Sequence, residues 1–311
     1  MKVTQYIQDI DNVKNSVVTV GSFDGVHLGH QILLKEVVER ALDMKGRSVV
    51  VTFEPHPKEV LRGNNIQLLT TLEERVALCG EAGIDILYVI PFTYEFSRNK
   101  SRDFYLKFLV EGIGVSEVVE GYDHHFGRDR EGGVESLLQL GKEFEFSVTA
   151  IKPVHVDGEL VSSSGIRQHL LDGEVDRASA LLGRHYGLSG FVIRGDGRGK
   201  TLGYPTANVQ PLSPKKLTPG NGIYFVKVKI QGKKYYGMLS IGVRPTFYKH
   251  GQRVIEVYVS DFEGDLYNQQ LELFFILKLR DEVKFDSSEA LIAQMNLDKQ
   301  RSAELQKVYP L

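Results

Sequence analysis

The pattern of strand and helix signals changes once along the chain, near Gly183. Before this point, short apolar runs typical of buried strands alternate with stretches of helical periodicity. After it, strand-like segments follow one another until a helical stretch at about 287–309. Strands that alternate with helices indicate a parallel sheet covered by helices, whereas consecutive strands indicate an antiparallel barrel or sandwich. We therefore expect an α/β domain at 1–182 and an all-β domain at 183–311, which suits a chain of 311 residues.

The expected elements follow from apolar periodicity and from the Gly, Pro and Asn residues between them. In the first half, strands are predicted at residues 16–20, 47–53, 84–90, 115–119 and 145–151. Helices are predicted at residues 30–44, 71–82, 101–111, 133–141, 163–172 and 174–182. In the second half, strands are predicted at residues 186–194, 222–230, 234–242, 253–260 and 270–279.

The composition argues against several classes of protein. Hydrophobic residues make up 42% and charged residues 25% of the chain, which is typical of globular proteins and not of disordered ones. No apolar run approaches the roughly 20 residues that a membrane helix needs, and the first ten residues lack the apolar core of a signal peptide. The single cysteine, Cys79, cannot form an internal disulfide or a multi-cysteine zinc site. We therefore expect a cytoplasmic protein without a membrane partner.

The charge is distributed unevenly between the two halves. Residues 1–182 hold 19 Lys and Arg against 28 Asp and Glu, whereas residues 183–311 hold 19 against 12. Because non-specific nucleic-acid binding rests on many phosphate contacts, the acidic first half is a poor candidate for it. The second half is mildly basic but has no long basic run. We expect no nucleic-acid partner, and the sequence leaves the oligomeric state open.

The segment GSFDGVHLGH at residues 21–30 is the sharpest motif of the first half. A predicted strand ends there, a turn with glycine follows, and a helix begins. Helix N-termini offer free N–H groups and a positive dipole end to a phosphate, and His27 or His30 could donate a hydrogen bond as charge builds on that phosphate. Two alternatives remain: the histidines only cap the helix, or they bind a metal ion together with Asp24.

Two further loops follow predicted strands of the same half. TFEPHP places His56 between two prolines, and GYDHHFGRDREG at 121–132 contains Asp123. Ligands collect at the carboxyl ends of parallel strands, so we expect these loops to face the same crevice as the first motif.

The segment SSSGIR at residues 162–167 opens a predicted helix. Its three hydroxyls, the helix N–H groups and Arg167 could form a second phosphate clamp. A serine N-cap is the structural alternative.

The second half begins with a glycine-rich turn. Gly195, Gly197 and Gly199 lie next to Arg198 and Lys200. Backbone N–H groups and two cations can hold a polyphosphate, although hairpins also use such turns routinely.

Two other features of the second half carry oxygen ligands. The tetrapeptide PTAN at 205–208 offers the side-chain oxygens of Thr206 and Asn208, and Mg²⁺ prefers oxygen ligands that it can share with ATP phosphates. An ordinary turn is the alternative. Glu256 lies on a predicted strand and could accept the proton of an attacking hydroxyl, or simply pair with a neighbouring strand.

Taken together, GSFDGVHLGH, TFEPHP, GYDHHFG and SSSGIR resemble the FAD synthetase module of bacterial bifunctional riboflavin kinase/FAD synthetases, which belongs to the HxGH nucleotidyltransferases. The resemblance covers about 1–182. It implies a Rossmann-like parallel sheet and the transfer of AMP from ATP to FMN, with pyrophosphate leaving and Mg²⁺ assisting. It implies catalytic roles for His27 and His30. The ATP contacts that it implies are Gly21, Phe23, Asp24, Gly25, His27, His30, His56, Asp123, Ser163, Ser164 and Arg167.

From Gly183 to nearly the C-terminus, the chain is similar to riboflavin kinase in segments such as GIYFVKV, GMLSIGVRPTF, DLYN and LRDEVKFDS. The similarity implies a six-stranded antiparallel barrel with a terminal helix. It implies Glu256 as the base toward the riboflavin 5′-hydroxyl and Arg280 near the flavin. The ATP·Mg²⁺ contacts that it implies are Gly195, Gly197, Arg198, Gly199, Lys200, Thr206 and Asn208, of which Thr206 and Asn208 bind the metal.

Two positions depart from the family patterns. His124 replaces an apolar aromatic residue in the third motif of the first half, and Ser240 replaces the Asn that commonly precedes IGxxPT. We expect a local structural effect from Ser240. Because His124 lies in a loop implied to be near the nucleotide, it motivates the alternative of a riboflavin kinase with a regulatory N-terminal domain.

We therefore predict a bifunctional enzyme of flavin cofactor synthesis. The barrel phosphorylates riboflavin to FMN and releases ADP, and the N-terminal domain converts FMN and ATP to FAD and pyrophosphate. An RNA-binding protein is a further alternative, but the sequence lacks a basic stripe with interleaved aromatic residues.

Overall fold

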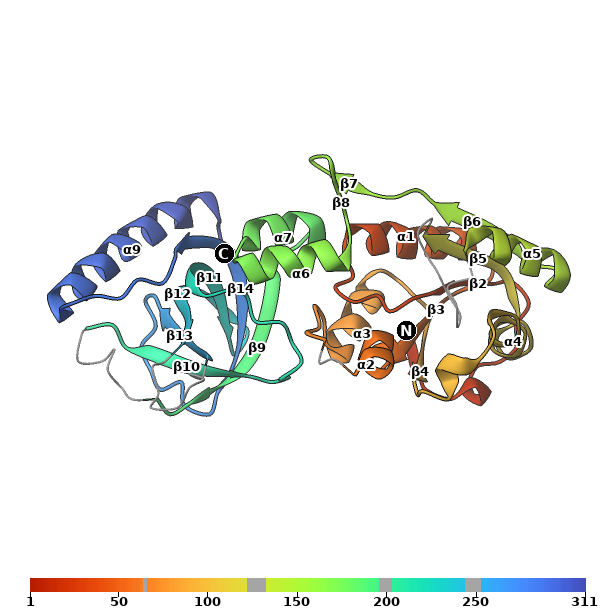
Figure 1. Cartoon of the computed structure of the whole chain (residues 1–311), viewed down its shortest axis with the longest axis horizontal. Helices are drawn as coiled ribbons and strands as arrows, with labels where there is room; N and C mark the ends of the chain where they lie inside the picture. The colour runs from red at the N-terminus through yellow and green to blue at the C-terminus, as the bar shows by residue number, and fades with distance from the viewer. Residues whose placement is uncertain (64–65, 122–132, 196–202, 244–252) are drawn as a thin grey trace. The chain divides into compact units, whose positions relative to one another are not determined.

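The computed structural model describes residues 1–63, 66–121, 133–195, 203–243 and 253–311. The chain divides into two compact units, Met1–Ser163 and Ser164–Leu311 (Figure 1). Among the helices of these ranges, none has the length and apolar character needed to cross a membrane.

The first unit is built on a six-stranded sheet in which all neighbouring strands are parallel. The strands are β1 (Lys2–Thr4), β2 (Ser16–Val20), β3 (Arg47–Glu54), β4 (Ile86–Pro91), β5 (Val115–Gly121) and β6 (Ser147–Ile151). Their order across the sheet is β1-β4-β3-β2-β5-β6. From β2, the chain extends the sheet in one direction through β3 and β4, and in the opposite direction through β5 and β6. The carboxyl ends of β2, β3 and β5 therefore lie at a topological switch point, where ligands of such sheets bind.

Helices lie on both faces of this sheet and bury its central strands (Figure 1). They are α1 (Leu28–Asp43), α2 (Pro57–Arg62), α3 (Leu72–Glu81), α4 (Ser101–Phe104) and α5 (Val134–Phe144). One apolar cluster joins Leu34 of α1 and Cys79 of α3 to Val50 of β3. A second cluster, on the other face, joins Phe104 of α4 and Leu137 of α5 to Val49. Burial on both faces explains why β2 and β3 are almost continuously apolar.

The predicted strands and helices of this half are present, together with elements that were not predicted, among them the 3-10 helices Ile7–Asp9 and Phe96–Arg98. The short edge strand β1 and the helix α2 were not predicted. A hairpin of β7 (His155–Val156) and β8 (Glu159–Leu160) also follows β6. The predicted helix at 101–111 becomes α4 and then a wider π-helical segment, Tyr105–Ile113. Periodicity does not distinguish these two windings, because both present an apolar face to the sheet.

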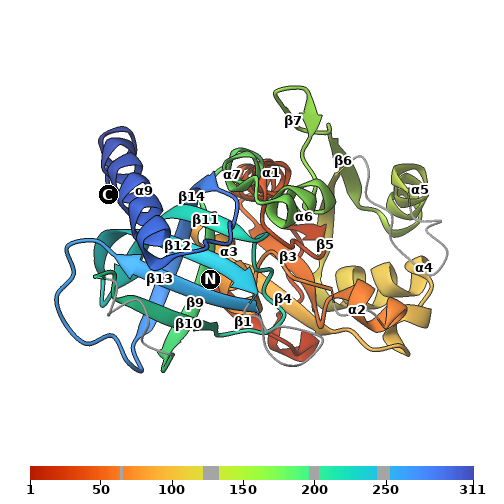
Figure 2. The same ribbon diagram turned by 60° about the vertical axis from the view of Figure 1, so that its left-hand side comes forward.

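The second unit is a closed antiparallel barrel with helices packed against it. Its strands are β9 (Tyr186–Ile193), β10 (Thr206–Pro211), β11 (Gly222–Ile230), β12 (Lys233–Val243), β13 (Arg253–Val259) and β14 (Gln270–Arg280), closed in the order β10-β13-β12-β11-β14-β9. The helices are α6 (Ser163–Asp172), α7 (Val175–Leu182) and α9 (Ser288–Val308). Figure 2 shows α9 beside the barrel strands, where Met295 and Leu305 pack on Phe225 and Met238.

The closed barrel settles two interpretations of the second half. The sandwich is excluded for this unit, and the segment PTAN is not a turn, because Thr206–Asn208 begin β10. This sixth strand pairs with both β9 and β13 and so closes the barrel. It was missed because Pro, Thr and Asn favour turns locally, whereas pairing on both sides overrides that preference.

Candidate functional sites

The turn between β2 and α1 has an unusual backbone. Phe23 has a φ of 48°, Val26 a φ of 38° and Gly25 a φ of 90°. A β-branched residue such as Val26 rarely adopts this left-handed region, at a cost of order 1–3 kcal/mol. The side chains of Phe23 and Val26 are buried in the core beneath α1. Packing therefore holds this part of GSFDGVHLGH in a strained shape.

Asp24 stabilises the same turn through buried hydrogen bonds. Its carboxylate is 1% exposed and accepts hydrogen bonds from the Leu69 N–H (2.9 Å) and the Thr70 N–H (2.9 Å). The Thr70 hydroxyl in turn accepts from the Gly25 N–H (2.8 Å). Within the described ranges, no group of three or more His, Cys, Asp or Glu side chains could hold a metal ion. A metal site of His27, His30 and Asp24 therefore has no support from the structure.

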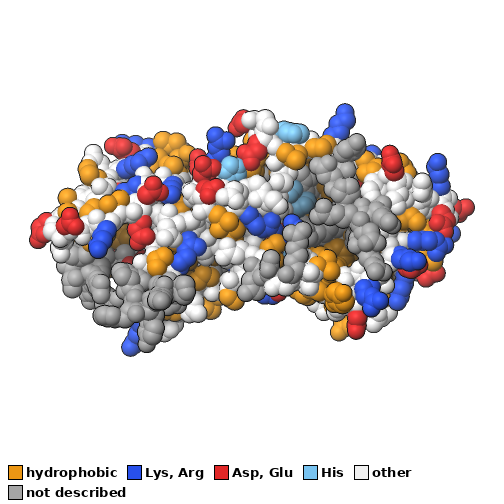
Figure 3. Space-filling model, viewed as in Figure 1, with side chains coloured by type: hydrophobic (Ala, Val, Ile, Leu, Met, Phe, Trp, Pro, Cys, Tyr) orange, Lys and Arg blue, Asp and Glu red, His pale blue; other side chains and the backbone are white. Residues whose placement is uncertain are grey.

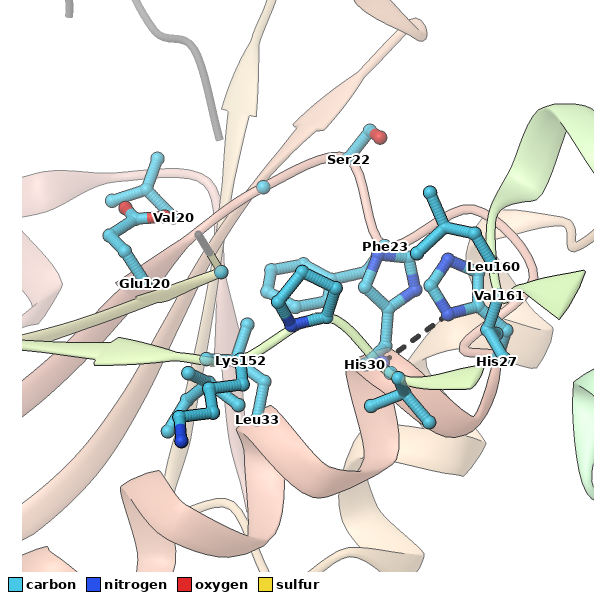
Figure 4. A pocket seen from close by; sticks show the side chains of 16 residues that line it. Val20, Ser22, Phe23, His27, His30, Leu33, Glu120, Lys152, Leu160 and Val161 are labelled. Carbon is cyan, nitrogen blue, oxygen red and sulfur yellow. Dashed lines mark hydrogen bonds between the residues drawn. The ribbon is translucent and has the colours of Figure 1, made fainter. Parts of the chain in front are cut away.

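His27 and His30 lie together where α1 begins. Their rings stack with centroids 3.7 Å apart and 13° between the planes, and Nδ1 of His27 accepts the His30 backbone N–H at 3.3 Å (Figure 4). The capping role expected as an alternative for His27 is therefore present. It does not exclude a role in binding, because an Nδ1 that accepts a hydrogen bond places the proton of a neutral ring on Nε2. His27 can thus cap the helix and still donate from Nε2.

The two histidines line a cavity of about 250 Å³ at the carboxyl edge of the sheet. Its walls include Gly21 and Phe23 from the turn, and Val154, Leu160 and Val161 from the segment that contains the hairpin. Figure 4 shows the rings near Leu160 and Val161, with Glu120 beside Val20. Three of the predicted contacts other than the histidines are therefore placed: Gly21 and Phe23 line the cavity, and Asp24 supports it from below.

Glu120 also lines this cavity but was not predicted as a site residue. It is the penultimate residue of β5 and is 1% exposed. Burial raises the pKa of its carboxyl well above the ordinary value, although a hydrogen bond with the Val20 backbone opposes this. Burial, and secondarily the nearby Glu120, likewise raises the pKa of the Tyr105 hydroxyl. The signal in the sequence was an acidic residue directly after the apolar pair Val118–Val119 and next to the GYD motif.

The raised pKa of Glu120 predicts a pH-dependent stability. The protonated form of Glu120 is favoured in the folded chain. Its contribution to the free energy of unfolding is therefore fully present below the pKa of Glu120 in the unfolded chain, and is lost as pH rises through the pKa in the folded chain. We expect Glu120→Gln, which stays neutral, to gain stability relative to the unmodified protein as pH rises above the ordinary carboxyl pKa, by up to about 1.4 kcal/mol per pH unit. Urea unfolding at several pH values measures this, and a difference that is independent of pH would contradict it.

The remaining predicted contacts of the first half are only partly placed. His56 is 5% exposed and caps α2, since its Nδ1 accepts the Lys58 N–H at 3.1 Å. Within the first unit, the Ser163 hydroxyl donates to the Asp24 carbonyl at 2.8 Å, so Ser163 contacts the strained turn. Ser164 and Arg167 lie on α6 in the second unit. Asp123 and His124 are outside the described residues.

A row of polar side chains crosses the outer face of the barrel. Glu256 of β13 lies opposite Asn208 of β10 on one side and opposite Ser240 of β12 on the other. Directly opposed residues of neighbouring strands share a face of the sheet. The Thr206 hydroxyl lies 3.4 Å from a Glu256 carboxylate oxygen. The structure thus brings Thr206, Asn208 and Glu256 together, although 50 residues separate the first and last in sequence.

The glycine-rich turn starts next to the side chain of Asn208. A Cβ atom at Gly195 would lie 2.1 Å from the Asn208 side-chain nitrogen, so a larger residue there would displace the Asn208 side chain. The beginning of the turn is therefore adjacent to PTAN, as the predicted ATP site requires. Gly197, Arg198, Gly199 and Lys200 are outside the described residues.

A second cavity, of about 440 Å³, opens beside Thr206. It is lined mainly by apolar side chains, among them Val192, Val257 and Phe262, together with Asp265. An apolar cavity with one or two polar groups at its rim suits an aromatic ring carrying polar substituents.

Arg280 lies in the same row of the barrel but is engaged with the terminal helix. It is opposite Ile223, which is itself opposite Ser240. Its guanidinium makes a two-pronged ion pair with Asp298 of α9, with an Nη2–Oδ2 distance of 2.8 Å. Arg280 therefore fixes α9 against the barrel, next to the apolar face that includes Tyr258 and Met238.

Comparison with known proteins agrees with this arrangement in both units. The model of the FAD synthetase family matches residues 9–165, and that of the riboflavin kinase family matches residues 182–306. A bifunctional riboflavin kinase/FMN adenylyltransferase from Listeria monocytogenes is 37% identical over 92% of this chain and 91% of its own length. The chain belongs to the bifunctional riboflavin kinase/FMN adenylyltransferase family. The Escherichia coli member is 33% identical over 98% of this chain and 97% of its own.

The bifunctional riboflavin kinase/FMN adenylyltransferase fold is also found in a solved structure. A crystal structure of a macrolide-efflux protein from Streptococcus pneumoniae has a TM-score of 0.89 and 32% identity, and the match covers 97% of this chain and 98% of that one. The protein is thus an enzyme with riboflavin kinase and FMN adenylyltransferase activities, both of which use ATP. The two family matches favour this over a kinase with an inactive N-terminal unit and over an RNA-binding protein.

The described surface agrees with a family that acts on small molecules. On the face shown in Figure 3, Lys and Arg side chains are interspersed with Asp and Glu. Such a mixed distribution differs from the single-sign stripe that favours a polyanion.

Proposed function

We propose that adenylyl transfer takes place at the cavity formed by the strained turn, the two histidines and the hairpin segment. A phosphate oxygen of FMN attacks the α-phosphorus of ATP, and the bond to pyrophosphate breaks. This phosphate is already ionised, so the step needs no general base. Its barrier is lowered by positioning and by hydrogen bonds to the oxygens on which charge builds. The observation that supports this most directly is the pair of stacked histidines at the N-terminus of α1.

His27 donates a hydrogen bond from Nε2 to the phosphates of ATP. His30 lies beside His27 and acts on the same phosphates. The N–H groups at the start of α1 favour the same anion. The other proposed ATP contacts of this module are Gly21, Phe23, Asp24, Gly25, His56, Asp123, Ser163, Ser164 and Arg167. Of these, Asp24 acts through the turn that it anchors, since its oxygens accept backbone hydrogens.

In the barrel, Glu256 accepts the proton of the riboflavin 5′-hydroxyl. The hydroxyl oxygen then attacks the γ-phosphorus of ATP, and ADP leaves. Its place on the same face as Thr206 and Asn208 supports this role. The flavin ring lies against the apolar face near Arg280, and the adenine ring occupies the cavity beside Thr206. The ATP phosphates are held by Gly195, Gly197, Arg198, Gly199 and Lys200.

Mg²⁺ is the proposed metal of the kinase site, and the residues present fit it. The Thr206 hydroxyl and the Asn208 amide oxygen are the neutral oxygen ligands that this ion accepts while it keeps waters and phosphates. When bound, the ion neutralises charge on the phosphates of ATP.

The metal assignment predicts the effect of Thr206→Val, which removes the hydroxyl and keeps the branched shape. We expect the Mg²⁺ concentration for half-maximal riboflavin phosphorylation to rise about 10-fold. The Mg²⁺ dependence of FAD formation from supplied FMN should stay unchanged, because that site lies in the other unit. An identical Mg²⁺ titration of the kinase in the variant and the unmodified protein would exclude Thr206 as a ligand.

One assay tests the function as a whole. The purified chain is incubated with riboflavin, ATP and Mg²⁺, and FMN and FAD are separated over time. We expect FMN to rise first and FAD to follow, and chelation of the metal to stop both. Accumulation of FMN without FAD would contradict activity of the first unit.

The functional modules proposed from these roles are residues 1–182 and 183–311. The compact units of the structure divide after Ser163, which groups α6 and α7 with the barrel. The proposed place of action is the cytoplasm, where ATP is supplied and a buried free thiol such as Cys79 stays reduced.

A further inference from the structure

Arg75 of α3 is a buried cation directly beneath the adenylyltransferase edge of the sheet. It is 2% exposed. Its Nη1 donates to the Ser22 carbonyl (3.0 Å), the Thr52 hydroxyl (3.2 Å) and the Phe53 carbonyl (3.2 Å). Ser22 belongs to the strained turn after β2, and the other two belong to the end of β3. One nitrogen therefore bridges the two neighbouring loops that contain the histidines.

The second nitrogen extends this bridge by one residue. Nη2 of Arg75 forms an ion pair with Glu54, the last residue of β3, two positions before His56. A planar guanidinium can serve these acceptors at the same time, whereas a lysine ammonium presents its donors from a single point. The side chain thus fixes the direction in which the chain leaves both strands.

Stability alone is a weak explanation for this arrangement. The Nε–H of Arg75 is buried without a hydrogen-bond partner among the described residues. A buried donor that lacks an acceptor is destabilising. Replacing buried ionic networks by apolar residues is often neutral or stabilising. A role in holding the two loops in register accounts for the residue better.

We propose that Arg75 is a positioning residue for adenylyl transfer. Through Ser22 and Glu54 it holds the turn of His27 and His30 and the loop of His56 as one rigid frame around the nucleotide. Loss or reorientation of the Arg75 side chain changes the distance between the histidines and the reacting phosphorus. It removes no group that touches substrate. The inference rests on the proposed placement of adenylyl transfer at this edge.

The test compares Arg75→Met and Arg75→Lys in the full chain. Misplacement by about 1 Å can cost about 10²-fold in rate. We expect Arg75→Met to lower kcat for FAD formation about 10²-fold and Arg75→Lys about 10-fold, with KM for ATP changed much less. Riboflavin phosphorylation by the same polypeptide serves as the internal reference and should be unchanged. Thermal unfolding confirms that each variant is folded.

Arg47 provides the matched control. It lies at the opposite end of β3 and also braces strand ends, since it donates to the Ser16 hydroxyl (3.0 Å) and the Ile113 carbonyl (2.9 Å). Arg47→Met should lower the melting temperature, while the folded variant keeps the kcat of the unmodified protein for FAD formation. If folded Arg75→Met also keeps the unmodified kcat, Arg75 is only structural and the inference is overturned.

Two further variants keep the test decisive. If Arg75→Met does not fold, Glu54→Gln removes the charge partner, whose side chain is 29% exposed. It should lower kcat for FAD formation several-fold, and an unchanged kcat would overturn the inference. His30→Ala in the same assay distinguishes a failure of the proposed site from a failure of the proposed role of Arg75. Full activity of His30→Ala contradicts the proposed site, whereas its loss beside a fully active Arg75→Met contradicts only the role of Arg75.

Discussion

His30→Ala is expected to lower the conversion of added FMN to FAD by about 10²–10³-fold, the range for removing one donor that stabilises charge in a transition state. The imidazole lies in the cavity wall and stacks on His27. Alanine removes the ring but keeps the backbone N–H that His27 accepts, so the start of α1 remains capped. The loss should therefore fall on the chemical step more than on folding.

The measurement for His30→Ala is FAD formation under single-turnover conditions, alongside riboflavin phosphorylation by the same sample. The kinase rate should be close to that of the unmodified protein. His155→Ala is the matched control, because His155 of β7 is an exposed histidine of the same unit that does not line the cavity. Equal loss of both activities in a folded His30→Ala protein would be incompatible with two separate sites.

The sequence predicted the architecture well where periodicity and topology act together. Apolar runs such as Val17–Val20 and Val49–Val51 are buried on both sides, so their pattern indicates central parallel strands directly. It failed at β10, where Thr206 and Asn208 follow Pro205 and have turn propensity, and only the closure of the barrel makes Thr206–Asn208 part of a strand. Pairing between distant segments is not visible in local propensity.

The site was predictable to the extent that its residues stand in motifs. His27, His30 and Gly21 were found in one short segment, and the structure brings them around one cavity. Glu120 and Arg75 were missed because each stands in an ordinary strand or helix with other charged residues, Glu117 in β5 and Glu73 and Glu74 in α3, and belongs to no motif. Their significance comes from burial and from partners far away in the sequence, such as the Ser22 carbonyl, which lies 53 residues from Arg75. Such information exists only in the folded chain.

In the kinase site too, some residues are found in a sequence motif, whereas the contacts between them arise only from the fold. Thr206 and Asn208 come from one tetrapeptide, whereas their contact with Glu256 arises from the pairing of β10 with β13. Ser240, a departure from the family pattern, lies opposite Glu256 on the third strand of this row. Any effect of Ser240 is therefore expected at the base rather than at the phosphates.

Glu256→Gln is expected to lower riboflavin phosphorylation by about 10²–10⁴-fold, the usual contribution of a general base. The amide keeps the size of the side chain and still accepts the hydrogen bond of the Thr206 hydroxyl, so the barrel should fold as before. It cannot take the proton of the attacking hydroxyl. ATP and riboflavin binding should change much less than the rate, because the lost interaction develops in the transition state.

The control for Glu256→Gln is Glu272→Gln, which changes another strand carboxylate of the same barrel. Glu272 pairs with Lys229 at 2.8 Å on the partly exposed surface and should be dispensable for rate. FAD synthesis from supplied FMN should persist in both variants, because that step deprotonates no hydroxyl. Single-turnover FMN formation and flavin fluorescence titrations give the rate and the binding separately. If Glu256→Gln phosphorylates riboflavin at the unmodified rate, Glu256 is a structural residue of β13 and the base must be sought elsewhere.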